Sequence, residues 1–347
     1  MECSGQPDVY YRPGYVRAWE PVERSSAIAL QLSHADKKWL LPLLTVSRPA
    51  SSGSPAARDA VTPYGYGGIL NLSPAKPSDD DFAASSLSPA AAAALISELR
   101  QWCAEQKLTC CVLRLHPLAR QGPAFEALQS DAVRLRRRGT TTAIDLRNWD
   151  ERAEGLHGIS KGRKSDLAYA QKRLRVTWSS DPTAKNLEAN SDTHLAIFSR
   201  IYRDTMARIA AQNFYLFPDA HFQALRAGLP RQSDIAVAWL GAEPVAAAFF
   251  LAGTVWAHYH LSGATDAGKS SKAATLLIHE GAKWAQQRGC RLLHLGGGRK
   301  ENDSLMAFKR GFGGELFEYH TLTVIADLAR FQELSRHPNS PWPYSDH

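Results

Sequence analysis

Short apolar runs alternate with amphipathic stretches along most of the chain. Three apolar runs, at 234–240, 245–251 and 255–261, are separated by tight turns, which predicts an antiparallel meander of three strands. Apolar residues at helical spacing then extend from about 271 to 288, before a strand predicted at 291–295. A short helix from about Asp303 to Gly311 and a last strand in "ELFEYHTLTVI" complete this half.

The first half of the chain repeats this order. A hairpin is predicted at 27–33 and 39–48, and "TPYGYGGIL" occupies the place of a third strand. Ser88 and Pro89 are typical of a helix start, and strands are predicted at 109–115, 132–138 and 140–146. The pattern Leu-Ile-x-Glu-x-x-x-Trp occurs in both long helices, at 95–102 and at 277–284. This internal repeat indicates that one unit is used twice.

The two halves are joined by a polar, helix-like stretch, "RNWDERAEGLHGISKGRKSDLAYAQKRLR". We therefore expect an N-terminal domain at 1–150, a basic helical bridge at 151–175 and a C-terminal domain at 176–347. The fold class that follows is α/β (α+β), with a mixed, mostly antiparallel sheet flanked by helices in each domain.

Composition narrows the class of protein. The 347 residues are 44% hydrophobic, which suffices to form hydrophobic cores. The sequence has no run of about 18 apolar residues, so no membrane span is predicted. The first residues lack the layout of a signal peptide, so we expect a cytoplasmic protein. The five cysteines lack metal-ligand spacing, so no metal site is expected. The net charge of +7 is concentrated in "RLRRR" and in 161–175, which suits a polyanionic partner or a solvated basic helix face.

Residues 263–270 match the P-loop pattern G-x-x-x-x-G-K-[ST]. The strand before them ends an antiparallel meander, whereas a P-loop strand lies in a parallel sheet. The next strand also carries His294 where an Asp would be needed to hold magnesium. The context disfavours a nucleoside triphosphatase and predicts a strand-to-helix turn, in which Lys269 and Lys272 could still meet the phosphate of an acyl donor.

The order meander, helix, strand, short helix, strand resembles the N-acetyltransferase (GNAT) core, and two such cores in tandem resemble the Fem-type aminoacyl-tRNA-dependent transferases. The stretch 258–314 carries the resemblance with a strand ending in Ser-Gly, a Gly-Gly turn, and Phe-Lys before Gly-Phe-Gly. "TTTAIDLRNW" with the Lys/Arg helix after it resembles the family's bridge, and "DAVTPYGYGG" resembles a strand of bacterial tandem relatives. The long helical arm that some Fem proteins insert has no counterpart in the sequence.

The resemblance implies an acyltransferase in which an acceptor amine attacks an activated acyl carbonyl directly. Aminoacyl-tRNA would be the co-substrate, no cofactor would be bound tightly, and the acceptor would be a peptide or a small-molecule amine. The alternative is an acyl-CoA-dependent N-acyltransferase acting on an amino sugar or small amine; a non-catalytic tandem domain is a further alternative. One glycine in "DAGKSSKAA", where acyl-CoA enzymes have two, favours a donor other than acyl-CoA. The sequence makes no prediction of oligomeric state.

The candidate catalytic residues follow from the same comparison. Lys309 matches the family's Phe-Lys and would stabilise the oxyanion, Phe308 would shape the acyl pocket, and Tyr259 would contact the acyl group or carry a proton. A solvated lysine, a core phenylalanine and a half-buried strand residue are the structural alternatives. The acceptor-binding candidates are Asp59, Tyr64, Tyr66, Tyr202, Arg208, Tyr215, His258 and His260. The candidates for binding the tRNA or another phosphate-bearing donor are Arg163, Lys164, Lys172, Arg173, Lys269 and Lys272.

Overall fold

The computed structural model describes residues 8–35, 37–48, 57–72, 87–147, 158–181, 191–298 and 303–336. The described residues form two compact units. Unit 1 contains those of Met1–Val9 and Thr140–Leu316, and unit 2 contains those of Tyr10–Gly139 and Phe317–His347. Each unit has its own set of strands and its own hydrophobic core.

The two units exchange strands. The domain boundaries expected near 150 and 175 do not allow for this exchange. The two strands expected at 132–138 and 140–146 are one long strand, β6 (Val133–Asp145), which runs from unit 2 into unit 1. The last strand, β12 (Glu315–Ile325), runs back into unit 2, where it pairs with β5 (Cys110–Arg114). Residues 151–157 of the expected bridge lie outside the described residues. The chain therefore alternates between the units instead of completing one before the other.

The strands of unit 1 pair in the order β6-β11-β10-β9-β8-β7. Its other strands are β7 (Leu174–Trp178), β8 (Ser233–Leu240), β9 (Glu243–Ala252), β10 (Trp256–Ala264) and β11 (Leu292–Gly297). The antiparallel pairing of β8, β9 and β10 confirms the predicted meander. β10 and β11 pair in parallel, as a strand-helix-strand connection requires.

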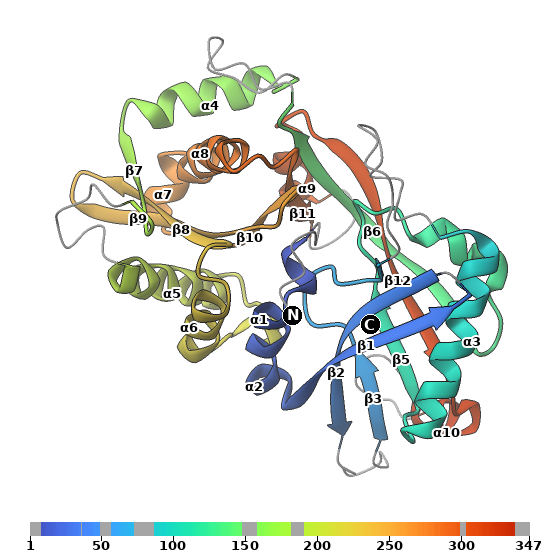
Figure 1. Ribbon diagram of the computed structural model, residues 1–347. Helices are drawn as coiled ribbons and strands as arrows, with labels where there is room; N and C mark the ends of the chain where they lie inside the picture. The colour runs from blue at the N-terminus through green and yellow to red at the C-terminus, as the bar shows by residue number, and fades with distance from the viewer. Residues whose placement is uncertain are drawn as a thin grey trace. The chain divides into compact units, whose positions relative to one another are not determined.

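Helices cover both faces of this sheet (Figure 1). α4 (Lys161–Gln171) and α8 (Ala273–Gln287) lie on one face, and α5 (Ser191–Arg208) and α6 (Asp219–Gly228) lie on the other. The apolar side of α8 packs on Phe250 of β9, whose ring occupies the space that a side chain at Gly281 would need. The glycine within α8 therefore serves helix-to-sheet packing.

The shorter helices of unit 1 lie at the ends of strands. α7 (Asp266–Ser270) fills the turn between β10 and α8, and α9 (Ser304–Arg310) follows β11. Asp303 caps α9 by accepting a hydrogen bond from the Met306 amide, and the C-cap is Gly311, as the sequence predicts. The connection from α5 to α6 contains only a short 3-10 helix, η5 (Asn213–Tyr215), so the inserted arm is absent here as expected.

Unit 2 repeats the plan with the strand order β1-β2-β3-β5-β12, and β4 pairs with β2. α3 (Pro89–Glu105) packs on these strands, and its N-cap Ser88 accepts a hydrogen bond from the Ala91 amide. The remaining elements are η1 (Val9–Tyr11), α1 (Pro13–Ala18), α2 (Glu20–Glu23), β1 (Ser25–His34), β2 (Lys37–Arg48), β3 (Ala57–Val61), β4 (Leu70–Asn71), α3 (Pro89–Glu105), η3 (Gly122–Leu128) and α10 (Leu328–Ser335).

The stretch "TPYGYGG" is a turn and not the third strand of the N-terminal half. That strand is β3, which ends at Val61, and the chain then turns through Gly65 and Gly68, both with positive φ. A Cβ on Gly65 would lie 2.6 Å from Cε1 of Tyr10, so the glycine also permits close packing of that ring. Turn chemistry prevails here over the strand preference of the tyrosines.

Candidate functional site

The parallel strands β10 and β11 stop pairing halfway along. Their ladder joins Trp256 to Leu292 and ends with the pair His258 and His294, although β10 continues to Ala264. The pairing of β10 with β9 shifts register just after Tyr259, and that of β11 with β6 shifts just after His294. We call the strand ends beyond this pair, 259–264 and 295–297, the strand fork. Main-chain groups that this ladder leaves unused at such a fork are suited to bind an acyl carbonyl.

Lys309 brings a cation to the fork. Its ammonium group donates a hydrogen bond to the Gly297 carbonyl at the end of β11, with Nζ and O 2.7 Å apart. The side chain is 8% exposed, and burial lowers its pKa to about 8, although Asp303 opposes this shift. A buried ammonium group with one fixed acceptor can donate its other N–H bonds to a developing oxyanion. The arrangement favours the functional role predicted for Lys309 over a solvated surface lysine.

Phe308 of α9 contacts Arg163 of α4. Its ring packs against Phe312, and the guanidinium of Arg163 lies 4.8 Å from the ring centroid. Arg163 also pairs with Asp166 at 2.9 Å, so its charge is engaged within unit 1. Arg163 was expected to bind the donor, and its contacts here give it a part in positioning α9.

Tyr259 lies where β10 leaves β11. Its ring packs on Phe250, and its hydroxyl is hydrogen-bonded with Ser262. Burial raises the pKa of Tyr259 to about 12, with the Ser262 hydrogen bond opposing the shift. The phenol is therefore protonated at neutral pH and can donate a hydrogen bond, which suits contact with an acyl group better than removal of a proton.

His258 is fully buried and bonded to a partner from the start of the chain. Its Nε2 lies 2.8 Å from Oδ1 and 3.0 Å from Oδ2 of Asp8, and its Nδ1 lies 3.4 Å from Nδ1 of His294. His260 has a pKa well below its usual value because it is buried and lies near His258 and His221. At neutral pH His260 is thus uncharged and a weak base. His258 is thus held in the interior of unit 1, and the acceptor contacts expected of the two histidines stay a prediction.

Five amides of the turn that matches the P-loop pattern are bonded internally. The amide of Gly268 donates to Oγ1 of Thr265 at 3.1 Å, and a Cβ at Gly268 would collide with the Val245 carbonyl oxygen. The amides of Thr265, Lys269, Ser271 and Lys272 donate to main-chain carbonyls. Gly268 is thus required for close packing, and these amides do not cradle a phosphate.

The two lysines of this turn face carboxylates. Lys269 pairs with Asp266 at 3.1 Å, and Lys272 lies 3.9 Å from Asp166 of α4. Lys272 adopts a left-handed conformation, with φ of 63°, at the N-cap of α8. Both side chains are about half exposed, so a donor phosphate would have to compete with these carboxylates.

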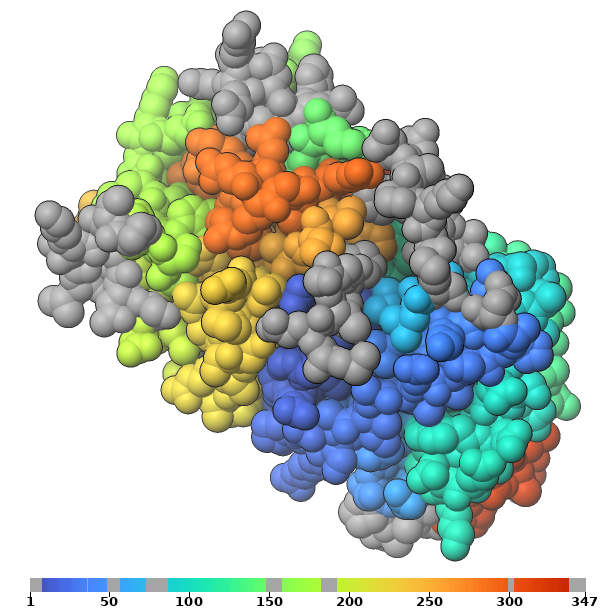
Figure 2. Space-filling model, viewed as in Figure 1, coloured from blue at the N-terminus to red at the C-terminus, as the bar shows by residue number. Residues whose placement is uncertain are grey.

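The end of α5 is fixed to the end of β10. Arg208 donates a hydrogen bond to the Ala264 carbonyl at 2.6 Å, and Tyr202 is buried with its hydroxyl donating to the Tyr215 carbonyl at 3.0 Å. Tyr202 is thus a core residue that supports the connection to α6. That connection exposes apolar side chains at Ile209, Phe214 and Leu216, and the segment 209–228 is on the visible surface, in yellow in Figure 2. An exposed apolar segment next to the fork suits an acceptor with an apolar part.

The unit 2 candidates have different surroundings. Asp59 is fully buried, accepts from Arg48 Nε at 3.1 Å and from the Cys110 thiol, and is therefore a structural carboxylate and not a surface ligand for an amine. Tyr64 and Tyr66 are half-buried in an aromatic cluster, with Tyr64 on Trp19 and Tyr66 on Tyr319. These tyrosines keep partly exposed rings, as a ligand-binding role would require.

The basic bridge is exposed on α4. Lys164, Lys172 and Arg173 are exposed, and Arg173 lies over the ring of Tyr169 at 3.8 Å. Lys161 and Arg175 extend the same basic surface. This surface offers cations and one partly exposed aromatic ring, which are the groups that contact phosphates and stacked bases.

Three groups of the site were not identified from the sequence. Asp8 is 250 positions from His258, and no local motif signals such a pairing. Thr205 accepts from the Ala264 amide, which fixes the end of β10, and Gly297 supplies the carbonyl that holds Lys309. The Gly-Gly-Gly run at the end of β11 is the one local signal that could have indicated Gly297.

Comparisons with known proteins agree with this geometry. Residues 160–310 match the Acetyltransferase (GNAT) domain family. The fold is similar to that of FemX, with 12% identity, a TM-score of 0.65, and coverage of 94% of this chain and 96% of that one. It is also similar to L-PGS from Bacillus licheniformis (13% identity, TM-score 0.51, 94% and 95% covered) and to a conserved protein of unknown function from Bacteroides thetaiotaomicron (10%, 0.54, 93% and 93%).

No curated protein matches the sequence significantly. Among the described helices, none has the length and apolar character needed to cross a membrane. The fork, the buried lysine beside it and the match over residues 160–310 are properties of one unit. The chain is an acyltransferase that carries a GNAT domain at residues 160–310 and has the tandem-GNAT fold of the Fem type.

Proposed function

We propose that the chain transfers an aminoacyl group from aminoacyl-tRNA to an amine of a peptide or small-molecule acceptor. The observation that carries the proposal is the α7 turn, in which the amide of Gly268 is bonded to Thr265 and its Cα packs on the β9 main chain. Acyl-CoA donors need free amides at this turn for their pyrophosphate. An aminoacyl ester on tRNA has no such requirement, since its phosphates can be bound elsewhere.

The similarity to FemX and L-PGS supports the same function at the level of fold. The basic surface of α4 supports it at the level of charge, because Lys164, Lys172 and Arg173 are exposed for phosphate contacts. α4 packs against α8, and Arg163 joins it to the helix that carries Lys309. A polyanion on α4 would therefore lie on the same unit as the reactive lysine.

The chemistry is a direct aminolysis. The neutral acceptor amine attacks the ester carbonyl, a C–N bond forms, and negative charge develops on the carbonyl oxygen, which Lys309 stabilises as a cation. The ester C–O bond then breaks, the ribose oxygen leaves with a proton, and the nitrogen loses one. No covalent intermediate with the protein is formed, so positioning and charge stabilisation supply the rate.

An acyl-CoA-dependent N-acyltransferase acting on an amino sugar or small amine is the second candidate. The match to the acetyltransferase domain favours it, because that fold uses acyl-CoA or a similar co-substrate. In that case Lys269 and Lys272 would have to leave Asp266 and Asp166 to bind the pyrophosphate. The two candidates therefore differ in the surface that binds the donor.

Donor binding separates the two candidates. We expect Lys164→Gln combined with Arg173→Gln to weaken binding of a charged tRNA and to reduce the slope of log affinity against log salt by about 1 for each phosphate that the variant no longer binds. The measurement is filter binding of aminoacyl-tRNA and of coenzyme A over a salt series. Arg231→Gln, an exposed cation elsewhere on unit 1, is the matched control. Tight binding of coenzyme A with no binding of tRNA would rule out the first candidate.

A further inference from the structure

Unit 2 contains a pocket far along its sheet from the turn that holds Tyr64 and Tyr66. The pocket has a volume of about 900 Å³ and is lined by the end of β2, the start of β3, the turn between α3 and β5, and the start of α10. β3 and β5 are parallel, and both begin at the pocket, whereas Tyr64 and Tyr66 follow the end of β3. The pocket is therefore at the opposite strand ends, and its volume is within the range of small-molecule sites.

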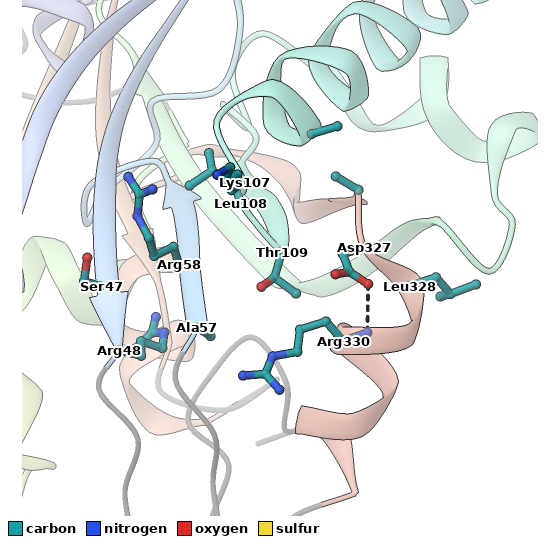
Figure 3. Close-up of a pocket in the computed structure, with 12 residues that line it drawn as sticks. Ser47, Arg48, Ala57, Arg58, Lys107, Leu108, Thr109, Asp327, Leu328 and Arg330 are labelled. Carbon is teal, nitrogen blue, oxygen red and sulfur yellow. Dashed lines mark hydrogen bonds between the residues drawn. The ribbon is translucent and has the colours of Figure 1, made fainter.

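Cations from four segments line this pocket (Figure 3). Arg48 and Arg58 come from neighbouring strands, Lys107 from the turn after α3, and Arg330 reaches from α10 toward the strands. The single carboxylate of the lining, Asp327, is engaged as the N-cap of α10, where it accepts from the Arg330 amide at 2.9 Å. The pocket is therefore electropositive.

Two of these cations have no carboxylate partner among the described residues. Arg48 pairs with buried Asp59, and Arg330 pairs with Glu333 at 2.6 Å. By contrast, Arg58 donates one hydrogen bond to a neutral acceptor, the Gln106 carbonyl, at 3.2 Å, and Lys107 forms no ion pair within the described ranges. Two uncompensated charges remain, which match the dianion of a phosphate monoester.

Lys107 occupies a position that folding alone would give to glycine. Its φ is 54°, its amide donates to the Ala104 carbonyl, and the Leu108 amide donates to the Cys103 carbonyl, which is the hydrogen-bond pattern of a helix C-terminus closed by a left-handed residue. A lysine there costs about 1 kcal/mol relative to glycine. The side chain is exposed and makes no ion pair with the described residues, so its charge is available to a ligand.

The floor between the cations is apolar. Ala57, Ala104, Leu108, Ala326 and Leu328 contribute to it. A ligand that fills this pocket would thus place a charged group at Arg58 and Lys107 and an apolar body over the alanines and leucines. We propose that the pocket binds a small phosphate monoester with an apolar body, at a site separate from the strand fork.

Calorimetric titration of the full chain with three probes tests this proposal. Adenosine monophosphate and hexyl phosphate carry the same charge on different bodies, and inorganic phosphate carries no body. We expect one of the two organic phosphates to bind at least tenfold more tightly than inorganic phosphate, and the comparison of the two identifies a nucleoside or an alkyl body. Lys107→Gly combined with Arg58→Gln should then weaken that binding by about tenfold or more, because two charge-assisted hydrogen bonds to the phosphate are removed.

The variants are chosen to keep the fold. Glycine suits the left-handed position of residue 107, and Arg58 is exposed, so the thermal midpoint of the double variant should be unchanged or higher. Arg100→Gln, an exposed cation on α3 outside the pocket, should leave binding unaltered. The proposal is overturned if none of the probes binds, if inorganic phosphate binds as tightly as the organic phosphates, or if the double variant binds as the unaltered chain does.

Discussion

Replacing Lys309 with methionine is expected to lower kcat about 10²–10³-fold, the loss typical of removing one oxyanion donor. Methionine keeps the length of the side chain in a site that is 8% exposed, and it removes the charge that burial disfavours. The Gly297 carbonyl loses one hydrogen bond, so we expect the free energy of unfolding to change by about 1 kcal/mol. Circular dichroism and thermal unfolding check that the fold is retained.

The pH profile separates a charge effect from a packing effect at Lys309. Its pKa of about 8 means that the ammonium form is lost as the pH rises through 8, so kcat should fall about tenfold per pH unit above that value. Lys309→Arg keeps a cation at every pH used, so the decrease in kcat above pH 8 should be absent in this variant. A kcat for Lys309→Met within threefold of that of the unaltered enzyme would contradict the role of Lys309 in stabilising the oxyanion.

Replacing Asp234 with alanine is expected to destabilise the chain by about 3–5 kcal/mol, the cost of breaking a buried charge network. Asp234 is fully buried and accepts from Ser179 Oγ at 2.7 Å, from the Ile235 amide at 3.0 Å and from Trp284 Nε1 at 3.0 Å. Arg288 lies 3.5 Å from the same carboxylate. The change would leave several buried donors, at Ser179 just after β7, on β8 and on α8, without an acceptor.

Urea unfolding followed by tryptophan fluorescence measures this destabilisation, since Trp178 stacks on Trp284 with ring centroids 5.6 Å apart. Glu243→Ala, at an exposed position of the β8-β9 hairpin in the same unit, should change the free energy of unfolding by less than about 0.5 kcal/mol. A destabilisation below about 1 kcal/mol for Asp234→Ala would show that the network is not what joins α8 to the sheet.

The order of elements in each half was predictable because hydrophobic periodicity reports it directly. The meander 233–264, the long helix α8 and the capped helix α9 follow from spacing and from Asp303 and Gly311. The turn at Gly65 was predicted as a strand because it occupies the place of the third strand in the repeat, while the close packing of Gly65 involves Tyr10, which is distant in sequence. Local sequence patterns predict local structure, but they do not predict contacts between residues that are distant in sequence.

Strand exchange and the buried charges could not be predicted in this way. β12 follows α9 in sequence, yet it pairs with β5, about 200 positions earlier, and its own residues do not encode that choice. The same holds for Asp8 beside His258 and for Asp59 beside Arg48, where the role of a carboxylate is decided by burial. An oxyanion-stabilising role for Lys309 was expected from the Phe-Lys resemblance, whereas its acceptor, Gly297, was not.

A single-turnover transfer assay tests the central claim most directly. The enzyme in excess is mixed with one charged tRNA or one acyl-CoA and a pool of amines, with and without ribonuclease, and the amide product is followed by mass spectrometry. We predict product from the charged tRNA, none after ribonuclease treatment, and a rate at least about a hundredfold lower with Lys309→Met. Product that requires acyl-CoA and is unaffected by ribonuclease would contradict the claim.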